Sequence, residues 1–313
     1  MNKNLTVVVA LALVAGLLAL GGGQALAATL VVDDDGFATA VNCDDSVAAD
    51  STTIQSAVDL ASPGDTVFIC PGIYNEQVKV VTNDLTIQGS GAGSTVIKPS
   101  SVSANTSSLF SGNPIAAIVV VEGTTGVELA DLTVDGSTAA FNVCSPGYMG
   151  IFYRASSGAI NDTQVLNIFH PTAPGCQAVL GIFVQSGNGG LGLNSNVAIG
   201  GTVVDNYGKN GITANEAGTF VTVTNNVVTG RGPVGSGDAA QNGVQIGFGA
   251  RGRVTENTIS DNDYTPTSWV ACGLLFFEGG GGLGKTTTNT FSGNEQNVCT
   301  AGVGPSAHSP FNE

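Results

Sequence analysis

One group of residues in this 313-residue chain has types and spacing that suit carbohydrate recognition. Each member lies two or four places after a glycine that returns about every 30 residues. Aromatic rings pack against the C–H faces of sugars, while amides and a guanidinium bind hydroxyls. The alternative is that an inserted loop covers the rings and makes them a second core. The predicted ligand strip consists of Phe152, Arg154, Phe183, Gln185, Thr213, Asn215 and Gln245.

Acidic residues suggest a second kind of chemistry, because carboxylates bind Ca²⁺. Asp261 and Asp263 are weak candidates for a metal site, and ion pairs with the nearby arginines Arg251 and Arg253 are the alternative. Asp135, Asp205 and Asp261 recur at one turn position, but in alternate coils. Their separation of roughly 10 Å is too large for one shared ion. We expect no cofactor other than Ca²⁺.

A repeat must position these side chains. A glycine followed by an aliphatic residue returns five times at a nearly constant interval of about 30 residues. The residues one and three places after each glycine are nearly all apolar, which is the period of a β-strand. A repeat of this length built from short strands predicts a solenoid of stacked β coils. The five segments begin at Gly150, Gly181, Gly211, Gly243 and Gly273.

A second marker runs in phase with the glycines. Asn226, Asn257 and Asn289 follow one another at the same interval as the glycines. Asparagine at one position of successive coils is typical of a ladder in which side-chain amides satisfy the backbone of the turns. These asparagines are therefore expected to be structural.

Composition limits the fold and the partners. The chain is 42% hydrophobic, which is too apolar for disorder, and its 45 glycines indicate turns between strands. Nine Lys plus Arg against 24 Asp plus Glu give a net charge of −15 and exclude a basic surface for nucleic acid. A continuous repeat favours one domain over residues 28–313, with coils at 66–299 and a tail at 300–313.

The N-terminus predicts export. Lys3, an apolar run from Leu5 to Leu20, and Ala25-Leu26-Ala27 form a signal peptide over residues 1–27. An uncleaved membrane anchor is the alternative. We expect a secreted, extracellular protein that does not contact the membrane after cleavage.

Because disulfides form in exported proteins, the six cysteines are expected to be paired. They form three neighbouring pairs, and the two members of each pair are separated by roughly one coil length, so partners would lie on adjacent coils. Metal ligation is the rival interpretation, but no Cys-x-x-Cys motif supports it. The predicted disulfides are Cys43 with Cys70, Cys144 with Cys176, and Cys272 with Cys299.

One helix is predicted, over residues 52–62. Thr52 and Gln55 form a capping-box pattern, and Pro63-Gly64 ends the helix. The helix would cover the open end of the first coil. The stretch Thr53 to Val67, then Cys70 to Glu76, then Leu85 to Gly89, resembles the opening of pectin-lyase-like proteins. That resemblance covers the chain from about Thr29 onward and implies a right-handed parallel β-helix, an all-β fold.

The resemblance is specific for fold and weak for activity. The polygalacturonase Gly-His-Gly and Arg-Ile-Lys, the epimerase Asp-Pro-His and the pectin methylesterase Gly-x-x-Asp-Phe-Ile-Phe-Gly are missing from this sequence. We therefore expect non-catalytic glycan binding or surface interaction, with an extracellular polysaccharide as partner. The alternative is a polysaccharide lyase or glycoside hydrolase acting on a pectin-like or uronate polysaccharide. The negative charge favours neutral glycans, or acidic ones bridged by Ca²⁺.

Overall fold

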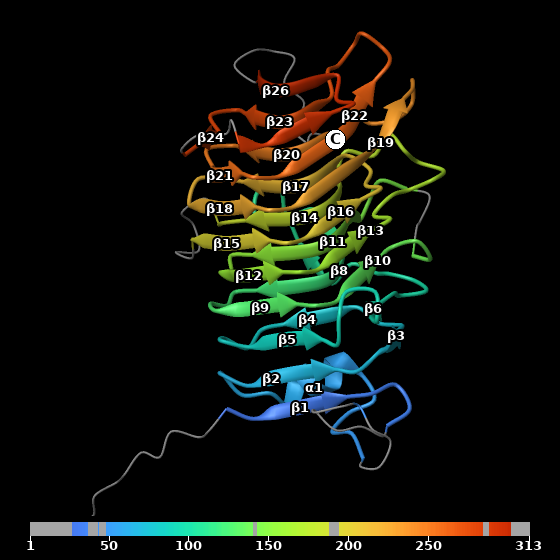
Figure 1. Cartoon of the computed structure of the whole chain (residues 1–313), viewed down its shortest axis with the longest axis vertical. Helices are drawn as coiled ribbons and strands as arrows, with labels where there is room; N and C mark the ends of the chain where they lie inside the picture. Colours follow the sequence, from blue (N-terminus) through green and yellow to red (C-terminus); the bar gives the residue numbers. More distant parts are fainter. Residues whose placement is uncertain are drawn as a thin grey trace, which may run out of the picture.

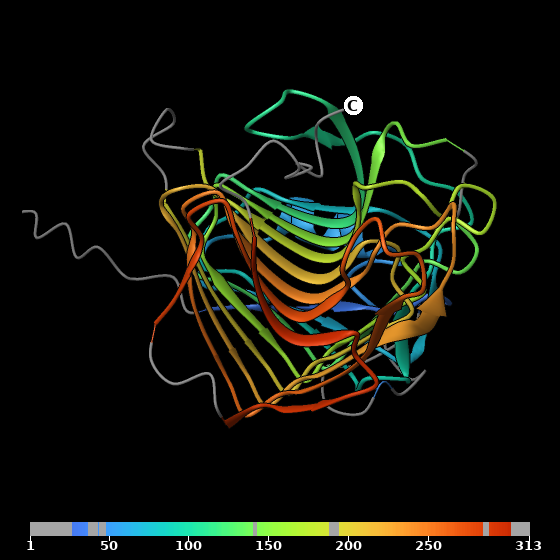
Figure 2. The same ribbon diagram turned by 90° about the horizontal axis from the view of Figure 1, so that it is seen from above.

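The chain winds as a parallel β-helix with three sheets running along its length (Figure 1). The structure is a computed structural model and describes residues 27–36, 43, 48–139, 143–187, 194–283 and 288–301. Seen from the C-terminal end, successive strands run anticlockwise as the chain rises toward the viewer, so the winding is right-handed (Figure 2). The predicted fold is confirmed. The predicted signal peptide, apart from Ala27, and most of the predicted tail lie outside the described residues.

The first sheet pairs its strands in parallel from the N-terminal to the C-terminal end. Its members are β1 (Thr29–Val32), β2 (Thr66–Ile69), β5 (Thr86–Gly89), β9 (Val127–Ala130), β12 (Gly158–Asn161), β15 (Ser195–Gly200), β18 (Thr219–Thr224), β21 (Arg251–Thr255) and β24 (Gly281–Gly282).

The second sheet follows the first around each coil. Its members are β3 (Gly72–Tyr74), β6 (Thr95–Ile97), β10 (Thr133–Asp135), β13 (Gln164–Leu166), β16 (Val203–Asp205), β19 (Val227–Val234), β22 (Thr258–Tyr264) and β25 (Thr290–Ser292).

The third sheet completes each coil and carries the Gly-aliphatic segments. A short strand, β7 (Thr106–Ser107), pairs antiparallel with the start of its second member. The parallel members are β4 (Val78–Val80), β8 (Pro114–Glu122), β11 (Gly147–Arg154), β14 (Val179–Gln185), β17 (Asn210–Asn215), β20 (Asn242–Gly247), β23 (Cys272–Phe277) and β26 (Gln296–Ala301).

The repeated glycines are explained by crowding inside the third sheet. A Cβ added to Gly181 would lie 2.6 Å from the carbonyl oxygen of Gly211 and 2.7 Å from a methyl of Val204 in the second sheet. Real Cβ atoms essentially never approach other atoms so closely. Gly150, Gly211 and Gly243 are crowded in the same way. Glycine therefore recurs because the backbone of the third sheet packs directly against side chains of the second.

The asparagine ladder is confirmed. The backbone N–H of Asn226 donates to Oδ1 of Asn257 (2.9 Å), and that of Asn257 donates to Oδ1 of Asn289 (3.0 Å). The Nδ2 of Asn257 donates to the carbonyl oxygens of Val223 and Thr255. Each side chain thus satisfies buried turn groups between the first and second sheets.

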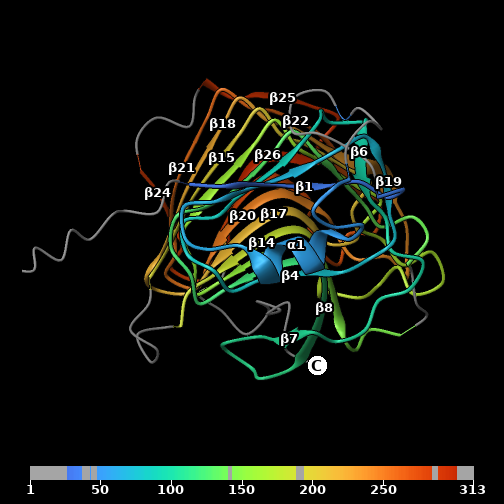
Figure 3. The same ribbon diagram turned by 90° about the horizontal axis from the view of Figure 1, so that it is seen from below.

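The helix α1 (Ile54–Leu60) lies across the N-terminal end of the coils (Figure 3). Ile54, Ala57 and Val58 are buried in the main core, as a covering helix requires. The predicted cap at Thr52 is wrong by one residue: the N-cap is Thr53, whose side chain accepts from the N–H of Ser56. Gln55 does not complete a capping box, because its amide bonds the backbone of Lys79 on β4.

All three predicted disulfides are present: Cys43–Cys70, Cys144–Cys176 and Cys272–Cys299. The third pair joins β23 to β26, which are neighbours in the third sheet. Within the described residues, no helix has the length and apolar character needed to cross a membrane.

Candidate functional site

The predicted ligand strip is aligned on the outward side of the third sheet. Phe152 pairs in register with Phe183, Phe183 with Thr213, and Thr213 with Gln245. Arg154, Gln185 and Asn215 form the adjacent column, one pleat nearer the strand ends. The alignment read from the glycine repeat is therefore correct. A binding role for the strip stays a prediction.

The lower part of this face forms a second apolar core. The rings of Phe152 and Phe183 stack with centroids 4.7 Å apart and planes 14° apart, and both side chains are fully buried. Ile115, Met149 and Leu180 pack with them. Rings in this state offer no surface to a sugar, and they contribute to stability through burial.

Segment 99–113 covers part of this face. The N–H of Leu109 donates to Oε1 of Gln185 (2.9 Å), and Nε2 of Gln185 donates to the hydroxyl of Ser108 (3.3 Å). The side chain of Asn105 bonds both the N–H and the carbonyl oxygen of Ala117 on β8. The inserted loop considered as an alternative is therefore present, and it holds Gln185 in place.

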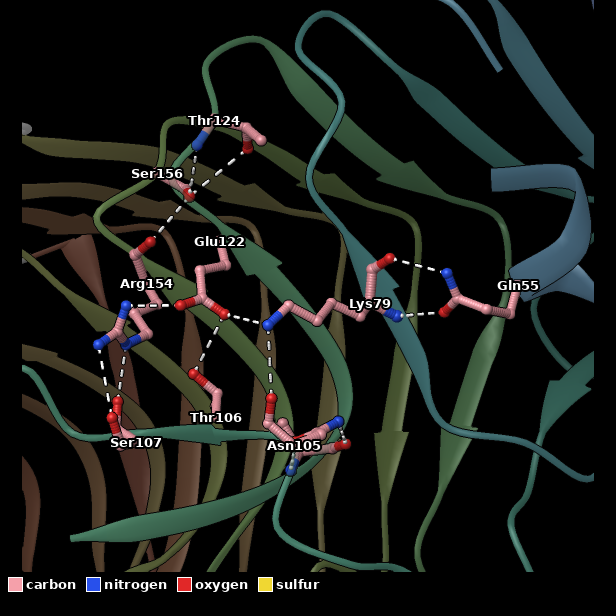
Figure 4. A network of polar contacts seen from close by, with 10 residues as sticks. Gln55, Lys79, Asn105, Thr106, Ser107, Glu122, Thr124, Arg154 and Ser156 are labelled. Carbon is pink, nitrogen blue, oxygen red and sulfur yellow. Dashed lines mark hydrogen bonds and ion pairs between the residues drawn. The ribbon is translucent and has the colours of Figure 1, made fainter. Parts of the chain in front are cut away.

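Arg154 also binds this segment (Figure 4). Its Nη1 lies 2.6 Å from one oxygen of Glu122, whose other oxygen lies 2.7 Å from Nζ of Lys79. Its Nε donates to the carbonyl oxygen of Ser107 (2.7 Å). One carboxylate thus neutralises two cations of the third sheet, and the guanidinium is occupied in holding the loop.

The middle of the face is an array of buried amides. Nδ2 of Asn210 donates to Oε1 of Gln245 (3.1 Å), and Nε2 of Gln245 donates to Oδ1 of Asn215 (3.1 Å). Nδ2 of Asn210 also bonds Thr213. Nδ2 of Asn215 is buried and has no hydrogen-bond partner among the described residues. A buried donor without a partner carries a desolvation cost, and full burial of this side chain keeps it out of reach of a sugar.

Three residues beyond the predicted strip stand where strands of the third sheet end. Glu216, Phe248 and Glu278 directly follow β17, β20 and β23, which are consecutive coils in register. All three have positive φ, of 78°, 51° and 38°. The N–H of Phe248 donates to the carbonyl oxygen of Phe277 (3.1 Å) and that of Glu278 to Ala301 (3.0 Å). The backbone thus fixes two carboxylates with an aromatic ring between them.

Aromatic rings gather around Phe248. Phe277 meets it edge-on with centroids 5.3 Å apart, and Phe110 of the inserted segment stacks at 6.3 Å. Phe110 is 53% exposed, and Phe248 is half-buried. Phe277 packs beside the Cys272–Cys299 disulfide, which holds this edge. We call Phe110, Glu216, Phe248 and Glu278 the strand-end site.

Burial changes the chemistry of Glu216. Its side chain is only 3% exposed, and desolvation raises the pKa of the carboxyl to about 7. A hydrogen bond from Gln185 opposes this rise in the pKa, while the charge of Glu278 adds to it. Near neutral pH, Glu216 is therefore present both as a proton donor and as an acceptor.

The aspartates considered as metal ligands do not lie together in a metal site among the described residues. Asp135 is held by Lys98 (2.9 Å) and by the Asn167 amide, so its role is structural. Asp261 and Asp263 lie on β22, and the Asp261 carboxyl faces the turn at Gly293. Across the described ranges, no group of three His, Cys, Asp or Glu residues could hold a metal ion.

The sequence does contain a signal for the strand-end site. Glu216, Phe248 and Glu278 each lie five places after a repeating glycine, one place beyond the predicted strip. Ser186 takes this place in an earlier coil. The pattern shows which residues share an edge. It does not show that Phe110 comes from a distant insertion to join them.

Comparison with known proteins gives structural neighbours only. No protein-family model matches the chain, and no curated protein matches it. Pectin methylesterase PemA from Erwinia chrysanthemi is 12% identical, with a TM-score of 0.47 and coverage of 92% of this chain and 91% of that one. Pectin methylesterase from carrot is 15% identical, with a TM-score of 0.42 and coverage of 89% and 90%.

A third neighbour is the GH136 lacto-N-biosidase from Eubacterium ramulus, 11% identical with a TM-score of 0.47. The match covers 87% of this chain but 60% of that one. The class of protein is set by the strand order: three parallel sheets wound as a β-helix. Similarity at this level assigns no activity to the chain.

Proposed function

We propose that this protein binds a glycan, without altering it, at the strand-end site. The observation that carries the proposal is the exposed Phe110 ring stacked near Phe248, which stands between Glu216 and Glu278 on consecutive coils. Rings supply an apolar platform for a sugar, and the carboxylates accept hydrogen bonds from its hydroxyls.

The proposed binding places the ligand beside the predicted strip rather than on it. Phe152 and Phe183 are buried, whereas Phe110 and Phe248 have exposed surface. The buried amide array would then stabilise the strands that carry the site. Export, predicted from the N-terminal signal peptide, would deliver the protein to extracellular polysaccharides.

The test is a glycan array with purified protein, followed by calorimetric titration of every oligosaccharide that binds. Phe110→Ala and Phe248→Ala are each expected to weaken binding about tenfold, since stacked aromatic contacts contribute roughly 1 kcal/mol or more. Phe220→Ala is the matched control, because Phe220 is a half-buried ring on the outward side of the first sheet. Equal loss of affinity in all three variants would place the ligand elsewhere.

A second candidate function is hydrolysis of a glycosidic bond. It is favoured by one observation, the pKa of Glu216 raised to about 7 by burial beside Glu278. A protonated Glu216 would donate to the leaving oxygen while Glu278 removes a proton from the attacking water. The two backbones are two coils, or roughly 10 Å, apart, so the side chains would have to lean toward each other to reach the carboxyl separation of about 6.5–9.5 Å in inverting enzymes.

Product analysis separates the two functions. Incubation with neutral and acidic polysaccharides, followed by measurement of reducing ends and of unsaturated products, would detect a hydrolase or a lyase. Activity that Glu216→Gln abolishes would replace the binding proposal. Bound oligosaccharides recovered intact would support it.

A further inference from the structure

We infer that the strand-end site selects neutral glycans and excludes uronates, with Glu216 and Glu278 as the residues that determine this specificity. The inference rests on the proposed function and deepens it. It concerns the charges around the Phe110 and Phe248 rings, where a bound sugar would lie.

Two carboxylates flank the Phe248 ring on the coils below and above it. A uronate ring that packs on Phe248 would bring its own carboxylate between them. Glu278 is half-buried and Glu216 is buried, so solvent screens the repulsion less than it would on an open surface. A hydroxymethyl group or an ester at the same ring position carries no charge and meets no such repulsion.

The nearby cations offset these carboxylates only in part. Lys79 and Arg154 both bind Glu122 at 2.6–2.7 Å. Nζ of Lys209 donates to the carbonyl oxygen of Ala240. Lys209 precedes β17 and so lies at the end of that strand opposite Glu216. Arg251 begins β21, and its Nη1 donates to the carbonyl oxygens of Gly279 (2.7 Å) and Ala250 (3.3 Å). These carbonyl groups are neutral, so Arg251 keeps its charge near Glu278, but it is one exposed cation against two carboxylates.

Polar groups at the site suit hydroxyls. Ionised Glu278, which is half-buried, accepts hydrogen bonds. Glu216 accepts when ionised and donates when protonated. A sugar hydroxyl both donates and accepts, so a neutral sugar can bond to both carboxyl groups. A uronate carboxylate only accepts, and therefore it cannot bond to ionised Glu278.

The experiment compares sugars that differ in charge. Binding of hexagalacturonate as the free acid and as the full methyl ester, and of β-1,4-linked hexamers of glucose, galactose and xylose, is measured by calorimetry at pH 8 and low salt, with Ca²⁺ and with chelator. At least one neutral hexamer or the ester is expected to bind ten times more tightly than the free acid, regardless of Ca²⁺. Both Glu216→Gln and Glu278→Gln are expected to reduce this ratio several-fold.

Glu256→Gln is the control, because Glu256 is exposed on a turn between the first and second sheets and lies outside the site. It should leave the ratio unchanged. Free acid binding as tightly as the neutral sugars, with or without Ca²⁺, would overturn the inference while leaving glycan binding in place. Binding of none of these sugars, and of none on the array, would remove the proposed function and the inference with it.

Discussion

At the scale of single residues, the stability of the fold depends on positions where one added methyl group or one change of ionisation has a large effect. The repeating glycines lie where the third sheet approaches the second too closely for a Cβ. Glu216 lies where burial alters the pKa of a carboxyl. Both effects follow from the surroundings of one side chain and can be tested by one substitution.

Gly243→Ala is expected to lower the free energy of unfolding by about 1–3 kcal/mol, because the new methyl would collide with Ile259 and with the Gly273 carbonyl oxygen. Denaturant titration measures the change. Gly235→Ala is the control: a Cβ there meets no described atom within 4 Å, and the backbone φ is not positive. Similar losses at both positions would contradict the crowding explanation.

Glu216→Gln is expected to change how stability depends on pH. The pKa of Glu216 in the folded state is about 7, above its ordinary value of 4.5, so the folded protein binds the proton more tightly than the unfolded chain. Stability from this group is complete below pH 4.5 and falls by up to about 3 kcal/mol as pH rises through 7. The variant should lack this fall.

The measurement is the free energy of unfolding of both proteins between pH 4.5 and 8. Burial lowers the pKa of His170 to about 4, so its contribution runs the other way: it is lost as pH falls below about 6.5. Subtracting the variant curve from the wild-type curve removes that contribution. A difference that stays constant across the range would mean that Glu216 titrates normally.

At the scale of elements, the inserted segment 99–113 and the third sheet form one unit. The antiparallel strand β7, the Asn105 amide and the Arg154 guanidinium all attach the segment to the outward side of the sheet. Phe110 reaches Phe248 only because these contacts hold the segment across several coils. The strand-end site therefore depends on an element that the repeat does not contain.

Arg154→Met is expected to loosen this segment. It removes the ion pair with Glu122 and the bond to the Ser107 carbonyl oxygen, a charge-assisted contact of about 1.5–3 kcal/mol. Amide exchange at Ser108 and Leu109 should become at least tenfold faster, as measured by hydrogen–deuterium exchange. Lys98→Met, which breaks the ion pair with Asp135 near the second sheet, should leave that exchange unchanged. Unchanged exchange in Arg154→Met would show that β7 alone holds the segment.

At the scale of the whole molecule, stability comes from stacking between neighbouring coils, with the N-terminal end covered by α1. Such proteins behave nearly as one-dimensional arrays, in which each coil contacts mainly its neighbours. Covalent links between adjacent coils should therefore act locally. The three disulfides lie in the first coils, in the middle and at the last strands.

Replacing Cys272 and Cys299 by serine is expected to lower the free energy of unfolding by about 3–4 kcal/mol, from the lost closure of a 27-residue loop. Exchange protection should fall mainly in β23 and β26. The Cys43 and Cys70 double variant is the comparison, because its loop has the same length of 27 residues at the opposite end. Loss of protection throughout the molecule in both variants would contradict local stacking.

The sequence by itself determined the coil. The period of the glycines, the apolar alternation after them and the asparagine ladder are local patterns, and each was found in the structure as expected. Even the register of Phe152, Phe183, Thr213 and Gln245 could be read from the chain, because residues at one phase of a solenoid repeat must lie above one another.

Only the tertiary structure decided which of these residues are exposed. The outward side of a strand need not face solvent, and here segment 99–113 covers part of the third sheet and holds Gln185 and Arg154. It also brings Phe110 to Phe248, which lies far along the chain. No periodicity specifies where an insertion folds, because its contacts depend on side chains from several coils at once. For the same reason the raised pKa of Glu216 could not be predicted from the sequence.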